Sequence, residues 1–372
     1  MRLRLALSGV LASLLLACSG GGGSDGGSGG GAGSDLVLTG SWKQVFVSAG
    51  VDNPSSAPRV AARAGEARLA WVSKTQRTRV LVVDAMGPRE LTLPQGTKGN
   101  PRVAFAGAAS VLVVPDPLQL GRFAAYREEA GTFSALASPV PGDELGAIEV
   151  TALGSDVFVA AQDVTLNAVV VERLDGAAWT RIGRFPLSGT LARLGFVGDG
   201  RSLVLMTLEG TATRTLRAYR SGAWEELGAP PPLASTSSLP FIAVDGQRVF
   251  FLEWDEAAQQ SIAWVHDGAA WSEWARSQAS ECFHALAVHG GALYTFSGTS
   301  PNSGSAPRTR ELARLDRGAV TRVALPFGPD SRGDVMLYEG SFLVSGGDAF
   351  YATYGEQGTS GFNAVRLHRV AR

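Results

Sequence analysis

Short apolar segments separated by polar turns recur along the chain from about residue 37 onward. In each repeat, one apolar segment ends at a glycine, a more continuously apolar segment follows, and a third comes after a polar loop. The glycines that end the first segments are spaced 42 to 50 residues apart: Gly65, Gly107, Gly154, Gly198, Gly246, Gly290 and Gly340. Because no stretch shows the 3.6-residue apolar period of an amphipathic helix, we expect strands throughout.

The second segments are nearly continuous apolar runs, which is typical of strands covered on both faces. They lie at 67–72, 110–114, 156–161, 202–206, 248–254, 292–296 and 341–345. The third segments lie at 79–83, 123–127, 168–173, 215–220, 261–266, 311–315 and 364–370. Between the second and third segments, the last two repeats carry long polar stretches that we expect to be loops, 297–309 and 346–361. A fourth strand follows a turn of small residues, because tight hairpins need backbone angles that glycine tolerates.

Four strands in a period of 40 to 50 residues are typical of a β-propeller blade. We therefore predict that residues 37–372 form one all-β domain, a seven-bladed β-propeller of four-stranded antiparallel blades. The last repeat lacks a fourth strand, and the segment GSWKQVF at 40–46 looks like the missing one. We expect residues 42–48 to pair with residues 364–370, so that the N-terminal strand closes the ring and leaves no open edge.

This architecture resembles the broad kelch and galactose-oxidase-like class of propellers over nearly all of residues 37–372. The diagnostic motifs are sparse. The Gly-Gly pair of kelch repeats fits one blade only, at 346–347, and the Trp-Asp dipeptide occurs once, at 254–255. Two Asp-Gly-Ala-Ala-Trp segments end like a sialidase Asp-box but differ from it in spacing. The resemblance therefore carries over no catalytic residue of any enzyme family.

The N-terminus has a different character from the repeats. Arg2 and Arg4 precede an apolar run that ends at Ala17, which is typical of a signal peptide and too short to span a membrane. The sequence Leu-Leu-Ala-Cys at 15–18 resembles a bacterial lipobox, which implies removal of residues 1–17 and lipid attachment to Cys18. An ordinary signal peptide followed by an incidental cysteine is the alternative. Ser19 does not resemble the aspartate that retains lipoproteins at the inner membrane, which favours anchoring in the outer membrane.

Residues 18–36 are predicted to form a disordered tether. Ten of the fifteen residues from 20 to 34 are glycine, and such a stretch behaves as a flexible coil. The whole chain has a formal net charge of -1 and 45% hydrophobic residues. This composition supports a large core and offers no basic field for nucleic acid. We expect a monomer without a nucleic-acid partner. With Cys18 acylated, Cys282 has no partner for a disulfide.

Polar residues recur near the start of the first strand of most repeats, where a propeller strand reaches the mouth of the central channel. They are Arg59, Arg102, Glu149, Arg193, His284 and Asp334, with the apolar Phe241 in the fifth repeat. Such a ring could supply convergent donors to a ligand. The alternative is that these residues only solvate the channel or pair with one another.

Two other groups point to packing more than to chemistry. Cys282, His284 and His289 form the one cysteine–histidine cluster, but its spacing is poor for zinc, and we expect a buried thiol and no metal. If the strand is regular, His289 faces away from His284. Tryptophans recur at one place in the repeat, where the fourth strand opens, which indicates packing between blades: Trp42, Trp179, Trp224 and Trp271.

The sequence therefore favours a non-catalytic module of the cell envelope that binds a ligand or serves as a scaffold, without a cofactor. Its partners would be the membrane, through the lipid on Cys18, and an envelope protein or glycan. Two alternatives remain open. One is a carbohydrate-active hydrolase or lyase with its site at the channel mouth. The other is an outer-membrane assembly factor, which rests on analogy with other lipoprotein propellers.

Overall fold

A computed structural model describes residues 43–48 and most of the chain from 58 to 370. It omits 64, 74, 76, 95–96, 98, 117, 120, 141–144, 211–212, 233–239, 290, 300–310, 325–334, 337–341, 346–347 and 358–361. Asp35–Arg372 form one compact unit. Met1–Ser34, with Cys18 and most of the predicted tether, lie outside the described residues, as does Trp42. The regular elements of the described residues are strands, and none of these residues forms a helix able to cross a membrane.

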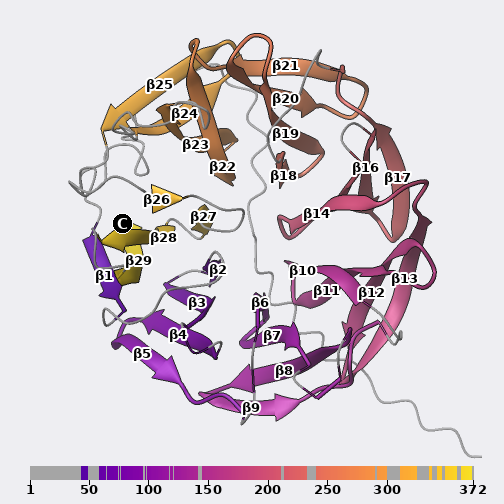
Figure 1. The fold of residues 1–372 in the computed structure, drawn as a ribbon, viewed down its shortest axis with the longest axis vertical. Helices are drawn as coiled ribbons and strands as arrows, with labels where there is room; N and C mark the ends of the chain where they lie inside the picture. Colours follow the sequence, from indigo (N-terminus) through magenta and orange to yellow (C-terminus); the bar gives the residue numbers. More distant parts are fainter. Residues whose placement is uncertain are drawn as a thin grey trace, which may run out of the picture. The chain divides into compact units, whose positions relative to one another are not determined.

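Four antiparallel sheets of four strands follow one another along the first part of this unit (Figure 1). The first two contain β2 (Arg59–Arg63), β3 (Glu66–Val72), β4 (Thr78–Asp84), β5 (Gly87–Leu91), β6 (Arg102–Ala106), β7 (Ala109–Pro115), β8 (Phe123–Glu129) and β9 (Thr132–Ala135). The next two contain β10 (Leu145–Leu153), β11 (Asp156–Asp163), β12 (Ala168–Asp175), β13 (Ala178–Pro186), β14 (Leu191–Gly198), β15 (Leu203–Glu209), β16 (Thr213–Arg220) and β17 (Ala223–Gly228). Within each sheet the strands pair in chain order, which is the predicted blade topology.

An eight-stranded sheet comes next. It contains β18 (Phe241–Asp245), β19 (Arg248–Asp255), β20 (Gln260–His266), β21 (Trp271–Arg276), β22 (Glu281–His289), β23 (Ala292–Thr299), β24 (Glu311–Asp316) and β25 (Ala319–Ala324). Each half, β18 to β21 and β22 to β25, is antiparallel and pairs in chain order. The halves are joined by one parallel pair between β20 and β22, Gln260 with Glu281.

The last sheet brings together segments from both ends of the unit. It contains β1 (Lys43–Val47), β26 (Val335–Met336), β27 (Phe342–Ser345), β28 (Asp348–Gln357) and β29 (Phe362–Val370). β1 pairs antiparallel with β29, from Lys43 opposite Arg369 to Val47 opposite Arg366. Ser48 continues this pairing, because its N–H donates to the carbonyl of Val365 at 2.8 Å and its Oγ accepts the Val365 N–H at 2.9 Å. The predicted pairing of the N-terminal strand with the last strand of the chain is confirmed.

The strand assignment within this last sheet was wrong in one respect. The sequence prediction placed a loop at 346–361, but residues 348–357 form β28, which lies between β29 on one side and β26 and β27 on the other. Phe350, Tyr351, Thr353 and Tyr354 are residue types that favour strands. Ser345 pairs with Asp348, so only a Gly-Gly dipeptide separates β27 from β28, and this is a two-residue hairpin signal.

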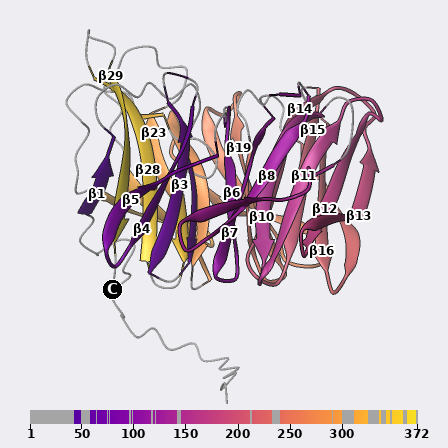
Figure 2. The ribbon, with the colours of Figure 1, turned by 90° about the horizontal axis from the view of Figure 1, so that it is seen from below.

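The sheets are arranged as a β-propeller, following one another around a common axis in chain order (Figure 1). Strands such as β4, β7 and β12 run from one face of the ring of sheets to the other (Figure 2). The innermost strands contact one another in succession from β2 to β22, and β27 contacts both β22 and β2. These inner strands therefore surround the axis.

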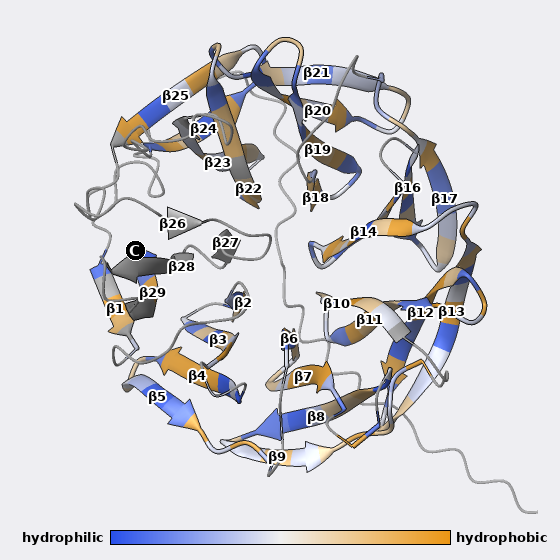
Figure 3. Ribbon diagram, viewed as in Figure 1, coloured by the Kyte–Doolittle hydropathy of each residue, from blue (hydrophilic) through white to orange (hydrophobic). Residues whose placement is uncertain are grey.

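Apolar side chains fill the spaces between consecutive sheets. The second strands supply most of them, and all seven residues of β15 are buried. Figure 3 shows the contrast between the hydrophobic strands β4 and β7 and the more hydrophilic strands β5 and β8. One cluster joins Phe46 of β1 and Leu367 of β29 to Leu69 and Trp71 of β3, with the Phe46 and Trp71 ring centroids 5.7 Å apart. The closing strand is thus packed as well as hydrogen-bonded.

Candidate functional site in the central cavity

A cavity of about 760 Å³ lies among the inner strands β2, β6, β10, β14, β18 and β22. Most of its wall consists of small apolar residues such as Ala61, Ala104, Val150 and Ala243. Small residues suit this position because neighbouring strands converge at the axis. Gly198 illustrates the crowding, since a Cβ on it would lie 2.3 Å from the carbonyl oxygen of Ala152 on β10.

Charged side chains from three different sheets meet at one end of this cavity. Arg59 and Arg102 are the first residues of β2 and β6, and Glu149 lies on β10. Arg102 donates from Nε to Oε2 of Glu149 at 2.8 Å, and Arg59 donates from Nη2 to Oε1 at 3.3 Å. The side chains of the two arginines are each 17% exposed and that of Glu149 is 14% exposed, so the group is accessible from the cavity.

The arginines decide the protonation state of Glu149. Burial by itself would raise the pKa of this carboxyl, but the charges of Arg102 and Arg59, with a further contribution from Arg193, outweigh burial and hold the pKa below its ordinary value. Arg193 is placed by an aromatic contact, with its guanidinium carbon 5.5 Å from the ring centroid of Phe241. Phe241, the apolar member of the predicted ring, therefore helps to position Arg193.

The structure brings together part of the predicted ring. Arg59, Arg102 and Glu149 are in direct contact, and Arg193 acts on Glu149 electrostatically. The side chain of His284 and the whole of Asp334 lie outside the described residues. The alternative that these residues pair with one another is correct for the three in contact. A ligand role for the group stays a prediction.

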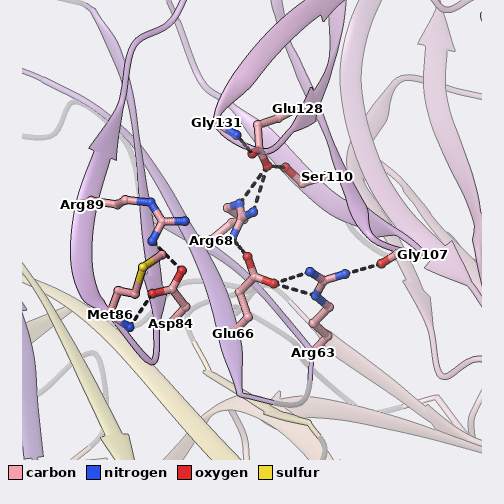
Figure 4. Close-up of polar contacts among 10 residues, drawn as sticks. All are labelled: Arg63, Glu66, Arg68, Asp84, Met86, Arg89, Gly107, Ser110, Glu128 and Gly131. Atoms are coloured by element: carbon pink, nitrogen blue, oxygen red, sulfur yellow. Dashed lines mark hydrogen bonds and ion pairs between the residues drawn. The ribbon is translucent and has the colours of Figure 1, made fainter.

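The other end of the cavity carries residues that the sequence analysis did not single out. Arg63 donates from Nε to Glu66 at 2.7 Å and from Nη1 to the carbonyl of Gly107 at 2.6 Å (Figure 4). Asp245 pairs with Arg248, and Asp199 accepts the Gly246 N–H from the next sheet. Arg63, Asp199 and Asp245 are thus held by contacts within and between sheets.

A buried ion-pair network continues outward from Arg63 (Figure 4). Glu66 also pairs with Arg68, and Nη2 of Arg68 lies 2.8 Å from Oε2 of Glu128 on the next sheet. The Glu128 side chain is 2% exposed and also accepts from the Ser110 hydroxyl and the Gly131 N–H. Burial opposes ionisation of Glu128, but its hydrogen bonds with Arg68 and Gly131 hold its pKa below the ordinary value. A signal was present in the sequence, because Arg68 interrupts an otherwise apolar second strand.

The repeated tryptophans join neighbouring sheets. The indole N–H of each donates to a backbone carbonyl of the preceding sheet or of the residues just after it: Trp179 to Ala137 at 2.8 Å, Trp224 to Ile182 at 3.1 Å and Trp271 to Leu227 at 3.1 Å. The Trp224 ring packs against the backbone at Gly183, where a Cβ would lie 2.9 Å from its Nε1. The prediction of a packing role between blades is confirmed for these three residues.

Of the predicted cysteine–histidine cluster, the structure describes the side chains of Cys282 and His289. Cys282 carries a buried thiol whose Sγ lies 3.8 Å from the hydroxyl of Ser261, while His289 lines the cavity. The argument that His289 faces away from His284 assumed a regular strand, but β22 has a register shift between His284 and Ala287, with Ala285 at a φ of 59°. Across the described residues, no three histidine, cysteine or acidic side chains are grouped to hold a metal ion.

No family model and no curated protein matches the chain. Among solved structures, the polysaccharide lyase Uly1 is similar with a TM-score of 0.56 and 10% identity, over 85% of this chain and 90% of that one. The β-propeller domain of the Trilobed protease from Pyrococcus furiosus, described as having an open velcro topology, gives 0.55 and 9% identity, over 87% and 95% of the chains.

A structure from a study of two prolyl endopeptidases also gives a TM-score of 0.55, with 15% identity over 86% of this chain. This chain spans half the length of that endopeptidase. At such low identities the similarity concerns the fold and not the activity. The fold of this chain is a β-propeller.

Proposed function

We propose that this chain is a seven-bladed β-propeller that acts as a non-catalytic binding or scaffold module of the bacterial cell envelope. The blade count is supported by the seven glycine-ended repeats and by the single residue pair that joins the halves of the eight-stranded sheet. We count each half as a blade, and the sheet of β1 and β26 to β29 as the last one.

The observation that carries the binding role is the group Arg59, Arg102 and Glu149 on the wall of the central cavity. A few convergent polar groups within mostly apolar walls are typical of ligand sites. A general acid needs a pKa near the working pH, whereas the pKa of Glu149 is lowered. Glu149 is therefore better suited to hold arginines in place than to deliver a proton.

The envelope location is supported by the N-terminal sequence. The charged start, the short apolar run and the small residue before Cys18 together favour a lipid anchor, and Ser19 favours the outer membrane. The glycine-rich segment would give the propeller freedom to move relative to its anchor. The ligand would then be an envelope protein or glycan.

Photo-crosslinking in intact envelopes tests the binding role. A diazirine-bearing residue replaces Val150 on the cavity wall in one full-length variant, and Met86, which is 82% exposed and outside the cavity, in a matched control. We expect an envelope-derived adduct at position 150 and none at position 86. Equal labelling at both positions, or no adduct at position 150, would contradict binding in the cavity.

The alternatives predict different results. Turnover of envelope glycans by the purified chain would replace the non-catalytic role with a hydrolase or lyase activity. Specific co-purification with outer-membrane assembly proteins, unaffected by changes in the cavity, would replace it with an assembly role.

A further inference from the structure

The inner strands of the propeller meet the central cavity with their edges. Successive side chains of a strand point to opposite faces, so a strand that turned one face to the cavity would line it with every second residue. Here consecutive residues line the cavity in each strand: Arg59–Arg63 of β2, Arg102–Phe105 of β6, Glu149–Ala152 of β10, Ile242–Asp245 of β18 and Leu286–His289 of β22. The backbones of these strands therefore form much of the wall.

Five of these inner strands have a partner strand on their outer side only. In the described part of the chain, β2, β6, β10, β14 and β18 each pair with one strand, which is β3, β7, β11, β15 and β19 in turn (Figure 1). These partner strands contribute no residue to the described wall, so the second edge of each inner strand faces the cavity. Such an edge presents backbone N–H and C=O groups, which form a template for pairing with another chain.

We propose that the cavity binds an extended peptide segment of a partner protein, which adds as a further strand to the edge of β2, β6 or β18. The proposal rests on the proposed binding function and specifies its ligand. These three strands pair with their neighbours without a register shift, whereas the registers of β10 and β14 are interrupted near their start. A regular edge offers regularly spaced donors and acceptors, and the backbone of an extended peptide has the same spacing.

The side chains of the wall fit recognition through the backbone. The middle of each of the three strands lines the cavity with apolar residues: Val60–Ala62 of β2, Val103–Phe105 of β6 and Ile242–Val244 of β18. At the ends of the cavity, Glu149 accepts hydrogen bonds from Arg59 and Arg102, and Asp245 pairs with Arg248. The polar groups along the middle of these strands are therefore those of the backbone, which a paired peptide would satisfy.

The size and chemistry of the cavity favour a peptide over a folded domain or a glycan. The three strands have five residues each and are about 17 Å long. A volume of about 760 Å³ is that of a small-ligand pocket, which admits a short segment but no folded domain. A helix would satisfy its own backbone groups and leave those of the edge unpaired. Phe105 and Phe196, the phenylalanines of the described wall, are buried between sheets, which leaves little aromatic surface to stack on a sugar ring.

Selection of random peptides of about nine residues on the full-length chain provides the probe for this site. We expect the selected peptides to be captured by the diazirine at position 150 and not at position 86. Hydrogen exchange of the complex should show slower exchange of backbone amides in β2, β6 or β18. The outer strands β5 and β9 are the control and should exchange at an unchanged rate. Failure to select any peptide that is captured at position 150, or protection only outside the inner strands, would overturn the proposal.

N-methylation of a selected peptide separates strand pairing from other modes of binding. Alternate N–H groups of an extended chain point toward the strand that it pairs with, so methylation of one alternate set should weaken binding at least about tenfold. Methylation of the other alternate set is the matched control and should change the affinity little. Equal effects of the two sets would overturn the pairing with an inner strand.

The envelope adduct at position 150 distinguishes failure of this proposal from failure of the binding function. An adduct that consists of glycan and resists protease digestion would leave the binding function intact and reject the peptide ligand alone. Absence of any adduct at position 150 would contradict binding in the cavity itself.

Discussion

At the scale of single residues, several carboxylates are buried between sheets, and their pKa is lowered at some positions and raised at another. Glu149 and Glu128 are held ionised by arginines. Glu253 on β19 lies with its Oε2 2.9 Å from Arg214, and it accepts the Trp264 indole N–H at 2.9 Å. Both contacts favour the ionised form. Burial, with a smaller contribution from the charge of Asp255, outweighs them and raises the pKa of Glu253 to about 7. The strength of burial relative to pairing therefore decides the charge of each site.

This difference predicts how stability depends on pH at Glu253. Because the pKa of Glu253 is raised in the folded chain, its contribution to the free energy of unfolding is fully present below 4.5, the pKa in the unfolded chain. This contribution is lost as pH rises through about 7. Glu253→Gln should therefore gain stability over the native chain as pH rises from about 4.5 to 7, by on the order of 2 kcal/mol. Chemical denaturation at several pH values measures the gain. Glu226→Gln, on an exposed pair with Arg217, is the control for removing a carboxylate from the surface.

Glu149 shows the opposite dependence. Its folded pKa is lowered, so its stabilising contribution is present above the ordinary carboxyl value of 4.5 and is lost as pH falls through the lower folded value. Glu149→Gln should therefore lose stability relative to the native chain near neutral pH, and the difference should shrink under acid conditions. Thermal unfolding between neutral and acid pH measures this, and a constant difference would contradict the ionised state.

The repeated tryptophans give a third prediction at this scale. Trp179→Phe, Trp224→Phe and Trp271→Phe each remove one indole N–H donor to a neighbouring carbonyl while keeping an aromatic ring. We expect each change to lower the free energy of unfolding by about 1 kcal/mol. Denaturant unfolding of the three variants measures the loss. Three unchanged values would mean that the tryptophans act through packing alone.

At the scale of elements, apolar runs located most strands because the second strands are buried on both faces. The segments 248–254 and 67–72 lie within β19 and β3 with little change at their ends. The prediction failed at β28, where the apolar run is short, at 349–352, and glycine and polar residues flank it. Periodicity could not reveal which of several segments would pair with β29, because pairing depends on contacts between distant parts of the chain.

The closing strand supports a prediction at the same scale. Deletion of residues 37–48 removes β1, the buried Ser48 and the contact of Phe46 with Trp71. We expect the unfolding midpoint to fall, because β29 loses its partner and apolar surface is exposed. Ser48→Ala is a milder change that leaves the N–H of Val365 without its acceptor and should remove about 1 kcal/mol. An unchanged midpoint in the deletion variant would show that the ring does not need this strand.

At the scale of the whole molecule, the repeat period indicated the propeller, whereas the chemistry of the cavity was only partly readable. The positions of Arg59, Arg102 and Glu149 follow from their equivalent places in successive repeats. Their pairing does not, because it depends on how far the side chains reach between successive sheets. The network of Arg68 and Glu128 was missed for the same reason, since its members are 60 residues apart.

The proposed anchor makes a prediction for the molecule in its cell. Cys18→Ala should abolish labelling with palmitate and release the chain from the membrane fraction, whereas Cys282→Ala should keep both, because Cys282 is buried within the propeller. These are the two cysteines of the chain, so the variants form a matched pair. Fractionation after metabolic labelling measures the result. Continued labelling of the Cys18 variant would contradict the lipid anchor.

The pairing of β1 with β29 also sets an order of assembly. Ser48 and Val365, which bond directly, are separated by 317 positions, and closing so long a loop is entropically unfavourable until the intervening sheets have formed. The last contact to be made would then be the one that joins the earliest and latest segments of the sheet. A chain cut or stalled anywhere between them would keep an unpaired strand edge, which is a surface for proteases and chaperones. The closure therefore distinguishes intact from damaged chains, because an intact propeller pairs the strand edge that a damaged one leaves exposed.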